Sequence, residues 1–141
     1  MVYPVHANEF QFNILGRAAS ASFVVCKDLT QFQPEIENES QEWRPFDLDG
    51  WRRATKTGNG LRFTFTGKRN YGDEGNDYIA GLALLDGEDV QTQLRWNMPN
   101  GDVMTIDCIV LVTSFGGGES TDVDPLEFEC ISDGVPVVTP V

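Results

Sequence analysis

The residues that could carry out chemistry are few in this 141-residue chain. His6 is the only histidine, so a catalytic triad or a histidine-based zinc site has little to build on. The three cysteines, Cys26, Cys108 and Cys130, contain no pair at the spacing of a zinc or redox motif. Cys108 and Cys130 fall on the apolar phase of alternating patterns, which predicts buried free thiols. We therefore expect no catalytic residue and no metal ligand.

Three short acidic or glycine-containing stretches share features with ligand-binding motifs. "DLDG" (Asp47–Gly50) is similar to the start of a calcium loop, but the later ligands and the closing glutamate are absent. "DGED" (Asp86–Asp89) predicts a solvated turn. "GKRNYGDEG" (Gly67–Gly75) lacks the order of a phosphate-binding loop, and its acids crowd the helix start that an anion would need. We expect no cofactor, and a small hydrolase using an Asp/Glu pair is the third of three hypotheses.

The net charge of the chain limits the kinds of partner that it can bind. Ten Lys and Arg residues against 22 Asp and Glu residues give a net charge of −12. This balance disfavours nucleic-acid binding through clustered cations, but it fits a surface that DNA passes without adhering. Self-association must also overcome like-charge repulsion, so an assembly needs wide apolar or backbone contacts. The sequence has no long apolar run, and it does not start with a basic segment followed by an apolar one. It therefore gives no indication of a membrane segment or of secretion.

Alternating apolar residues predict a single, mainly β domain over residues 1–141. The predicted strands are Glu9–Gly16, Ala21–Lys27, Gln31–Asn38, Gly60–Gly67, Gln91–Met98, Val103–Phe115 and Pro125–Ser132. "PNGD" (Pro99–Asp102) predicts a hairpin turn. Asp73 is a plausible N-cap of one short helix, Asp73–Leu85, whose apolar stripe is Tyr78, Leu82 and Leu85. The expected fold is an antiparallel β-sandwich or half-barrel with this helix covering the sheet.

Three segments lie outside this pattern. Met1–Asn8 and Val135–Val141 are predicted to be an N-terminal and a C-terminal arm. Between them, Ser40–Gly60 is predicted to be a long loop that holds Trp43, Trp51 and four of the ten basic residues, namely Arg44, Arg52, Arg53 and Lys56. Long loops in small domains are often functional. This loop is either folded down by its own aromatic residues or used for docking to a partner.

The motifs after this loop resemble a known family. "EWRPFDLDGWRR", "TGKRNYGDEGNDYIAGL", "WNMPNGD" and "GGGESTDVDPLEFECISDG" occur in an order that resembles the major tail tube protein of long-tailed bacteriophages. The resemblance runs from about Glu42 to Pro140. The chain departs from the family at Glu74, where members often carry a proline that would preorganise the helix start. Tubes of phage tail-like particles and of contractile tails use similar subunits.

The resemblance implies a structural, non-enzymatic subunit. Such subunits form hexameric rings that stack into a hollow tube, in which each subunit adds its sheet to a continuous β-barrel. The implied partners are further copies of the chain and the tail tip or baseplate, tape measure and tail terminator proteins. DNA would pass through without tight binding. The implied location is the virion tail, after synthesis and assembly in the host bacterial cytoplasm.

Within that family, roles can be expected for particular residues. The predicted inter-ring and inter-subunit contacts are Trp43, Arg44, Trp51, Arg52, Arg53, Lys68 and Arg69, the last two pairing with a neighbour's acids. The lumen candidates are either Gln33, Glu35 and Glu37 or Glu127 and Glu129. The alternative to a tube subunit is a monomeric β-sandwich binding module, for example for carbohydrate, whose exposed tryptophans would stack on sugar rings.

Overall fold

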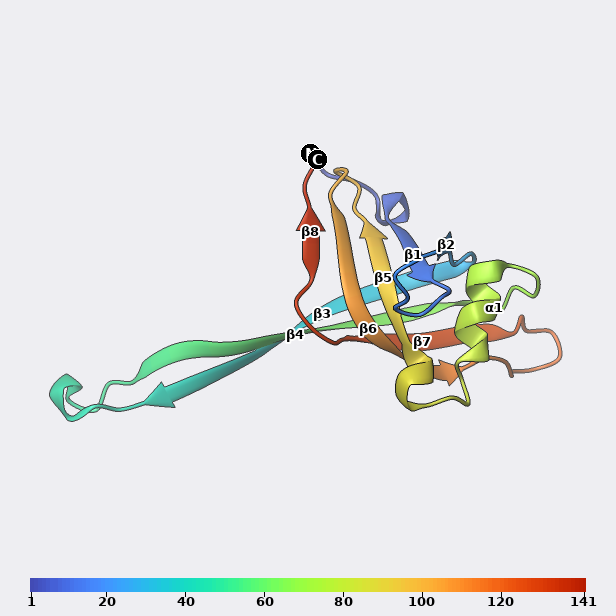
Figure 1. Cartoon of the computed structure of the whole chain (residues 1–141). Coiled ribbons are helices and arrows are strands. Elements are labelled where there is room, and N and C mark those ends of the chain that lie inside the picture. Colours follow the sequence, from blue (N-terminus) through green and yellow to red (C-terminus); the bar gives the residue numbers. More distant parts are fainter.

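A computed structural model describes all 141 residues. Eight strands form one antiparallel sheet in the order β2-β1-β5-β6-β7-β4-β3, and β8 pairs with β6 beside this path (Figure 1). The strands are β1 Glu9–Asn13, β2 Phe23–Val25, β3 Leu29–Trp43, β4 Arg53–Lys68, β5 Gln91–Asn97, β6 Val103–Ser114, β7 Pro125–Ser132 and β8 Val137–Thr139. The helices are α1 Glu74–Gly81 and the short 3-10 turns η1 Val5–Ala7, η2 Phe46–Leu48 and η3 Gly87–Val90.

The sheet is rolled, so that its two ends face each other across an aromatic core. Phe10 of β1 lies 4.6 Å from Phe32 of β3 and 4.9 Å from Phe65 of β4, measured between ring centroids. These strands stand far apart in the order of the sheet, so the contacts require strong curvature. Phe128 of β7 stacks on Phe65 at 4.9 Å. Burying each such ring contributes about 1.5–3 kcal/mol to folding, and the predicted half-barrel is confirmed.

The cysteines lie in or beside this core. Cys26, Cys108 and Cys130 are buried free thiols, as the strand pattern predicts. Burial, with the nearby carboxylates of Asp73 and Asp28, raises the pKa of the Cys26 thiol to about 12. Burial also raises the pKa of Cys130. The thiols of Cys26 and Cys130 therefore stay protonated at neutral pH and are poor nucleophiles.

Helix α1 begins where the sequence predicts and ends early. The Asp73 side chain accepts a hydrogen bond from the Asn76 amide at 3.1 Å, which confirms the N-cap. The predicted end at Leu85 is wrong, because the amide of Leu82 bonds to the Ile79 carbonyl in a tighter turn. Leu82 is buried but Leu85 is 48% exposed, and Ile79 takes its place in the core. The apolar stripe is therefore shorter than predicted.

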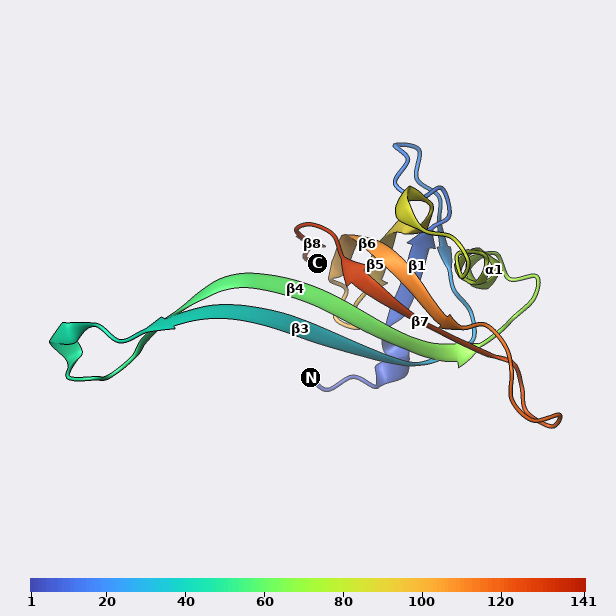
Figure 2. The ribbon, with the colours of Figure 1, turned by 90° about the horizontal axis from the view of Figure 1, so that it is seen from below.

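The predicted loop Ser40–Gly60 is mostly regular structure, which corrects the sequence prediction. β3 continues to Trp43 and β4 begins at Arg53, with register pairs along this length from Glu37↔Gly60 to Trp43↔Arg53. Only residues 44–52 connect the two strands. The outer part of this hairpin projects from the body as a two-stranded ribbon (Figures 1 and 2). Neither face of the ribbon packs on the core, so its sequence shows no apolar alternation.

The chain ends are more ordered than two free arms. Met1 to Pro4 have no regular structure, but η1 follows, and Asn8 accepts a hydrogen bond from the Trp96 indole at 2.9 Å. At the other end, β8 pairs with β6, and the Val141 amide donates to Asp102 at 3.2 Å. Within the predicted C-terminal arm, residues 135–141, backbone pairing holds Val137–Thr139 against β6, and the role of this segment as an arm stays a prediction.

Candidate functional site

A long stretch without packing partners inside the molecule is the hairpin ribbon, defined here as residues 35–57. Every residue in this range except Pro45 is exposed. A two-stranded hairpin with no packed face is marginally stable alone in water. The ribbon also exposes apolar side chains, including Ile36 at 62% and Trp43 at 44%. An extended, uncovered ribbon of this kind is typical of a surface that is buried in an assembly.

The tip of the ribbon, residues 44–53, is tightly built. The Trp51 amide bonds to the Leu48 carbonyl at 2.9 Å, and Asp49 takes a left-handed backbone conformation with φ +49°. Arg44 donates to the carbonyl of Gly50 at 3.1 Å, which closes the turn. The turn leaves Phe46 fully exposed and Trp51 78% exposed. Such aromatic side chains on a rigid turn are suited to anchoring on a partner.

The predicted contact residues of the tip do lie together. Arg52 forms a long ion pair with Glu42 at 3.5 Å, and the Arg53 guanidinium lies over the Trp43 ring at 5.9 Å. Both pairs are exposed, so each contributes little to stability. Sequence reasoning missed Phe46, although "RPFDLDG" places it directly after a proline inside the aromatic and basic segment. The partner of these residues stays a prediction.

Both sets of lumen candidates lie on a single face of the sheet. The register pairs Gln33 with Thr64, and Thr64 with Glu129. On the same strands, Phe63 and Phe65 point to the core. The sequence left the choice between the β3 set and the β7 set open, but strand β4 lies between them and joins both into one surface. Their exposure to a lumen stays a prediction.

We call this surface the acidic face. Its charged members are Glu35, Glu37 and Glu39 of β3, Arg62 and Lys68 of β4, Asp107 of β6, and Glu127 and Glu129 of β7. Arg62 contacts Glu37 at 3.2 Å and Glu129 at 2.9 Å. The hydrogen bond to Glu37 raises the pKa of Arg62, with the charge of Glu129 adding to it. Arg62 and Lys68 therefore offset only part of the negative charge of this face.

The two basic residues after β4 differ in their surroundings. Arg69 is bound inside its own chain: its guanidinium lies 2.7 Å from Asp77 and 2.9 Å from the Asn76 side-chain oxygen. Only 10% of its side chain is exposed. Arg69 therefore already has an acidic partner within its own chain, and its predicted pairing with a neighbour's acids stays a prediction. Lys68 is exposed and has no ion pair within the chain, so its prediction stands untested.

The stretch Gly67–Asp77 is a structural joint built around Asn76. Asn76 is fully buried, and its amide donates to the carbonyls of Lys27 and Lys68 at 3.1 and 2.9 Å. Its oxygen accepts from the Asn70 amide as well as from Arg69. The side chain thus ties the end of β4 and the segment after β2 to the start of α1.

No group of three or more His, Cys, Asp or Glu side chains is arranged to hold a metal ion. None of the helices has the length and apolar character needed to cross a membrane.

The fold of this chain is similar to those of several solved structures. Neither a family model nor a curated protein matches the sequence. The tail of an empty gene transfer agent (GTA) particle with C6 symmetry matches with TM-score 0.75 and 16% identity, over 98% of this chain and 99% of that one. The virion of a native GTA particle matches with TM-score 0.71 and 15% identity, over 98% and 99%. The cap that terminates the tube of the anti-feeding prophage (AFP) matches with TM-score 0.60 and 12% identity, over 100% and 94%.

These similarities establish the fold. The chain has the architecture of phage-like tail tube structures, as the resemblance in the sequence implies. The near-complete coverage in both directions means that the rolled sheet, α1 and the hairpin ribbon are matched as one unit.

Proposed function

We propose that the chain is a non-enzymatic structural subunit of a phage-type tail tube, assembled as stacked hexameric rings. The single observation that carries the proposal is the match over 98% of this chain to a tail with C6 symmetry. The uncovered hairpin ribbon supports it, since the monomer leaves a long exposed element that an assembly would cover. Head-to-tail contacts between identical subunits close into rings when the rotation permits.

In this proposal the acidic face lines the lumen of the tube. Its six carboxylates outnumber its two cations, Arg62 and Lys68. Phosphates in DNA would be repelled along the whole path, so the genome would slide without adhering. The partly buried Glu127 and Glu129 sit in the middle of the sheet and are well placed for this role.

The ribbon, with Trp43, Trp51 and the arginines of the tip, would contact the next ring. Lys68 would contribute at the subunit interface. The proposed partners beyond the chain itself are the tail tip or baseplate, the tape measure and the tail terminator proteins. The proposed location is the virion tail, with synthesis and assembly in the cytoplasm of a bacterial host.

Negative-stain electron microscopy of the purified protein tests the proposal. Rings or hollow filaments with sixfold symmetry are expected. The absence of any annular particle at high protein concentration, with a single monomeric species in analytical ultracentrifugation, contradicts it. Glycan binding by such a stable monomer would favour the β-sandwich binding module instead.

A further inference from the structure

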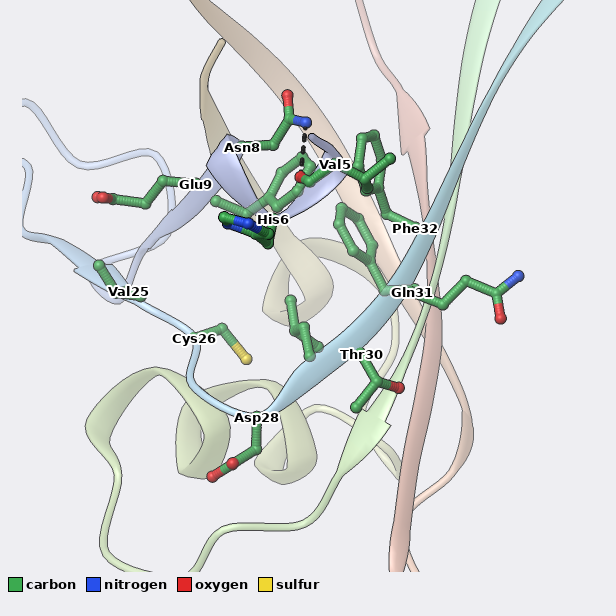
Figure 3. A pocket seen from close by; sticks show the side chains of 13 residues that line it. Val5, His6, Asn8, Glu9, Val25, Cys26, Asp28, Thr30, Gln31 and Phe32 are labelled. Carbon is green, nitrogen blue, oxygen red and sulfur yellow. Dashed lines mark hydrogen bonds between the residues drawn. The ribbon is translucent and has the colours of Figure 1, made fainter. Parts of the chain in front are cut away.

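A groove lies where the two ends of the rolled sheet face each other. Its volume is about 340 Å³, and its walls come from η1, β1, the segment after β2 and the start of β3 (Figure 3). Half-buried Phe32 gives it apolar surface, the buried rings of Phe10 and Phe65 lie beneath it, and Val5 at its edge is 69% exposed. Pockets of about 300–1,000 Å³ accommodate groups as large as a drug molecule. An aromatic side chain with its neighbours therefore fits.

The groove and the ribbon tip have complementary charge. The thirteen residues that line the groove include no lysine or arginine, but they include the exposed carboxylates of Glu9 and Asp28. Residues 44–53 hold three arginines and two aspartates, so the tip is net positive in a chain of net charge −12. The tip also presents the fully exposed Phe46. An apolar groove with acidic edges matches an aromatic tip with basic neighbours.

Building on the proposed function, we propose that this groove receives the ribbon tip of a second copy of the chain. The Phe46 ring enters the groove beside Val5 and Phe32, and the arginines of the tip face Glu9 and Asp28. Donor and acceptor are different surfaces of one molecule, so the contact is head-to-tail and can repeat from copy to copy. The partner of the ribbon is thereby assigned to a defined site on the neighbour.

The same chain cannot fill its own groove. Phe32 lines the groove, whereas Phe46 lies beyond the far end of β3, and the eleven residues from Phe32 to Trp43 span about 36 Å at about 3.3 Å per residue. The ribbon points away from the body in both views (Figures 1 and 2). When the tip of one copy docks in the groove of the next, the two copies are offset by the distance between the groove and the tip within one molecule. The axial rise between successive copies therefore cannot exceed about 45 Å.

Disulfide trapping tests the contact. The double variant Val5→Cys/Phe46→Cys carries one new thiol at the groove and one at the tip, while the native thiols are buried. A mild oxidant is expected to produce a ladder of covalent oligomers on a non-reducing gel. The matched control is Val5→Cys/Phe115→Cys, because Phe115 is 51% exposed on a different loop. Each single variant controls for symmetric pairing.

The outcomes separate this inference from the proposed function. A ladder that forms with Val5→Cys/Phe46→Cys but not with the control supports the inference, whether or not tubes are visible. Tubes with no ladder, or an equal ladder in the control, overturn the inference and leave the tube function intact. If neither tubes nor a ladder form, the inference and the proposed function are both overturned.

A second variant gives an independent measurement. Phe46→Ala removes a fully exposed side chain, so the melting temperature should stay within about 2 °C of the parent. The critical concentration for polymerisation is expected to rise at least tenfold. An unchanged critical concentration would contradict the insertion of Phe46.

Discussion

The side chain of Asn76 is fully buried, and every polar atom on it is used. Replacing it with alanine would leave the carbonyls of Lys27 and Lys68 without these donors. Each unsatisfied buried group costs about 1–3 kcal/mol, so Asn76→Ala should lower the free energy of unfolding by about 2–4 kcal/mol. Chemical denaturation of the assembly-free monomer measures this. Asn76→Asp should also lower the free energy of unfolding, because it places a carboxylate against two carbonyls. Variants as stable as the parent would contradict the structural role assigned to Asn76.

The neighbouring Asp77 predicts a pH dependence. Its pKa is held below the ordinary value of 3.8, first by the hydrogen bond from Arg69 and also by that from the Gly72 amide. Because the folded pKa is lowered, the stabilisation is present at neutral pH and is lost as the pH falls through the folded value. Asp77→Asn should therefore melt at a lower temperature than the parent at pH 7. The difference in melting temperature should shrink below about pH 4. A difference that does not change with pH would rule out the charge of Asp77 as its source.

At the scale of elements, two glycines of α1 make a matched pair. A Cβ built on Gly75 would collide with the Val25 carbonyl, approaching its carbon to 2.8 Å, whereas one built on Gly81 meets nothing within 4 Å. The close approach of α1 to the segment after β2 therefore requires glycine at position 75. Gly75→Ala should destabilise by about 1–3 kcal/mol, whereas Gly81→Ala should stabilise by up to about 1 kcal/mol. Thermal unfolding of both variants tests the contact, and equal effects would refute it.

The elements also show how far the sequence alone can lead. Strand β4 near Phe63 and Phe65, and β7 near Phe128, were predictable because one face is buried and the residues alternate. The outer half of the β3–β4 hairpin was not, because both of its faces are exposed and its residues carry no burial signal. Likewise, the groove depends on curvature that brings β1 to β3, and a local pattern does not encode such a long-range contact.

The tip residues could be grouped from sequence because they are adjacent in the chain. The acidic face could not, because its members come from strands whose order in the sheet is set by the fold: β4 separates β3 from β7 and places Arg62 between Glu37 and Glu129. The partner of Arg69 within the chain was likewise not predicted. Its charge suggested a partner in another subunit, but Asp77, one helical turn after the N-cap, binds it within the same chain.

For the whole molecule, the position of the acidic face in the assembly makes a test possible. Glu35 is exposed on that face and forms no ion pair, and Glu88 is exposed in η3, away from it. Glu35→Lys and Glu88→Lys change the net charge of each subunit equally, so any difference between them reports position. If the acidic face lines the lumen, tubes of Glu35→Lys should retain short DNA at low salt, whereas tubes of Glu88→Lys should retain none inside.

Filter binding and electron microscopy of labelled DNA measure this retention. Retention by Glu35→Lys should fall steeply as salt rises, because each phosphate contact releases counterions. Six subunits per ring would repeat the new cation around the path, so even one substitution should be sufficient to slow DNA passage. If DNA binds the outer wall of Glu35→Lys tubes, or binds both variants alike, the acidic face lies outside the lumen and another surface of the sheet must line it.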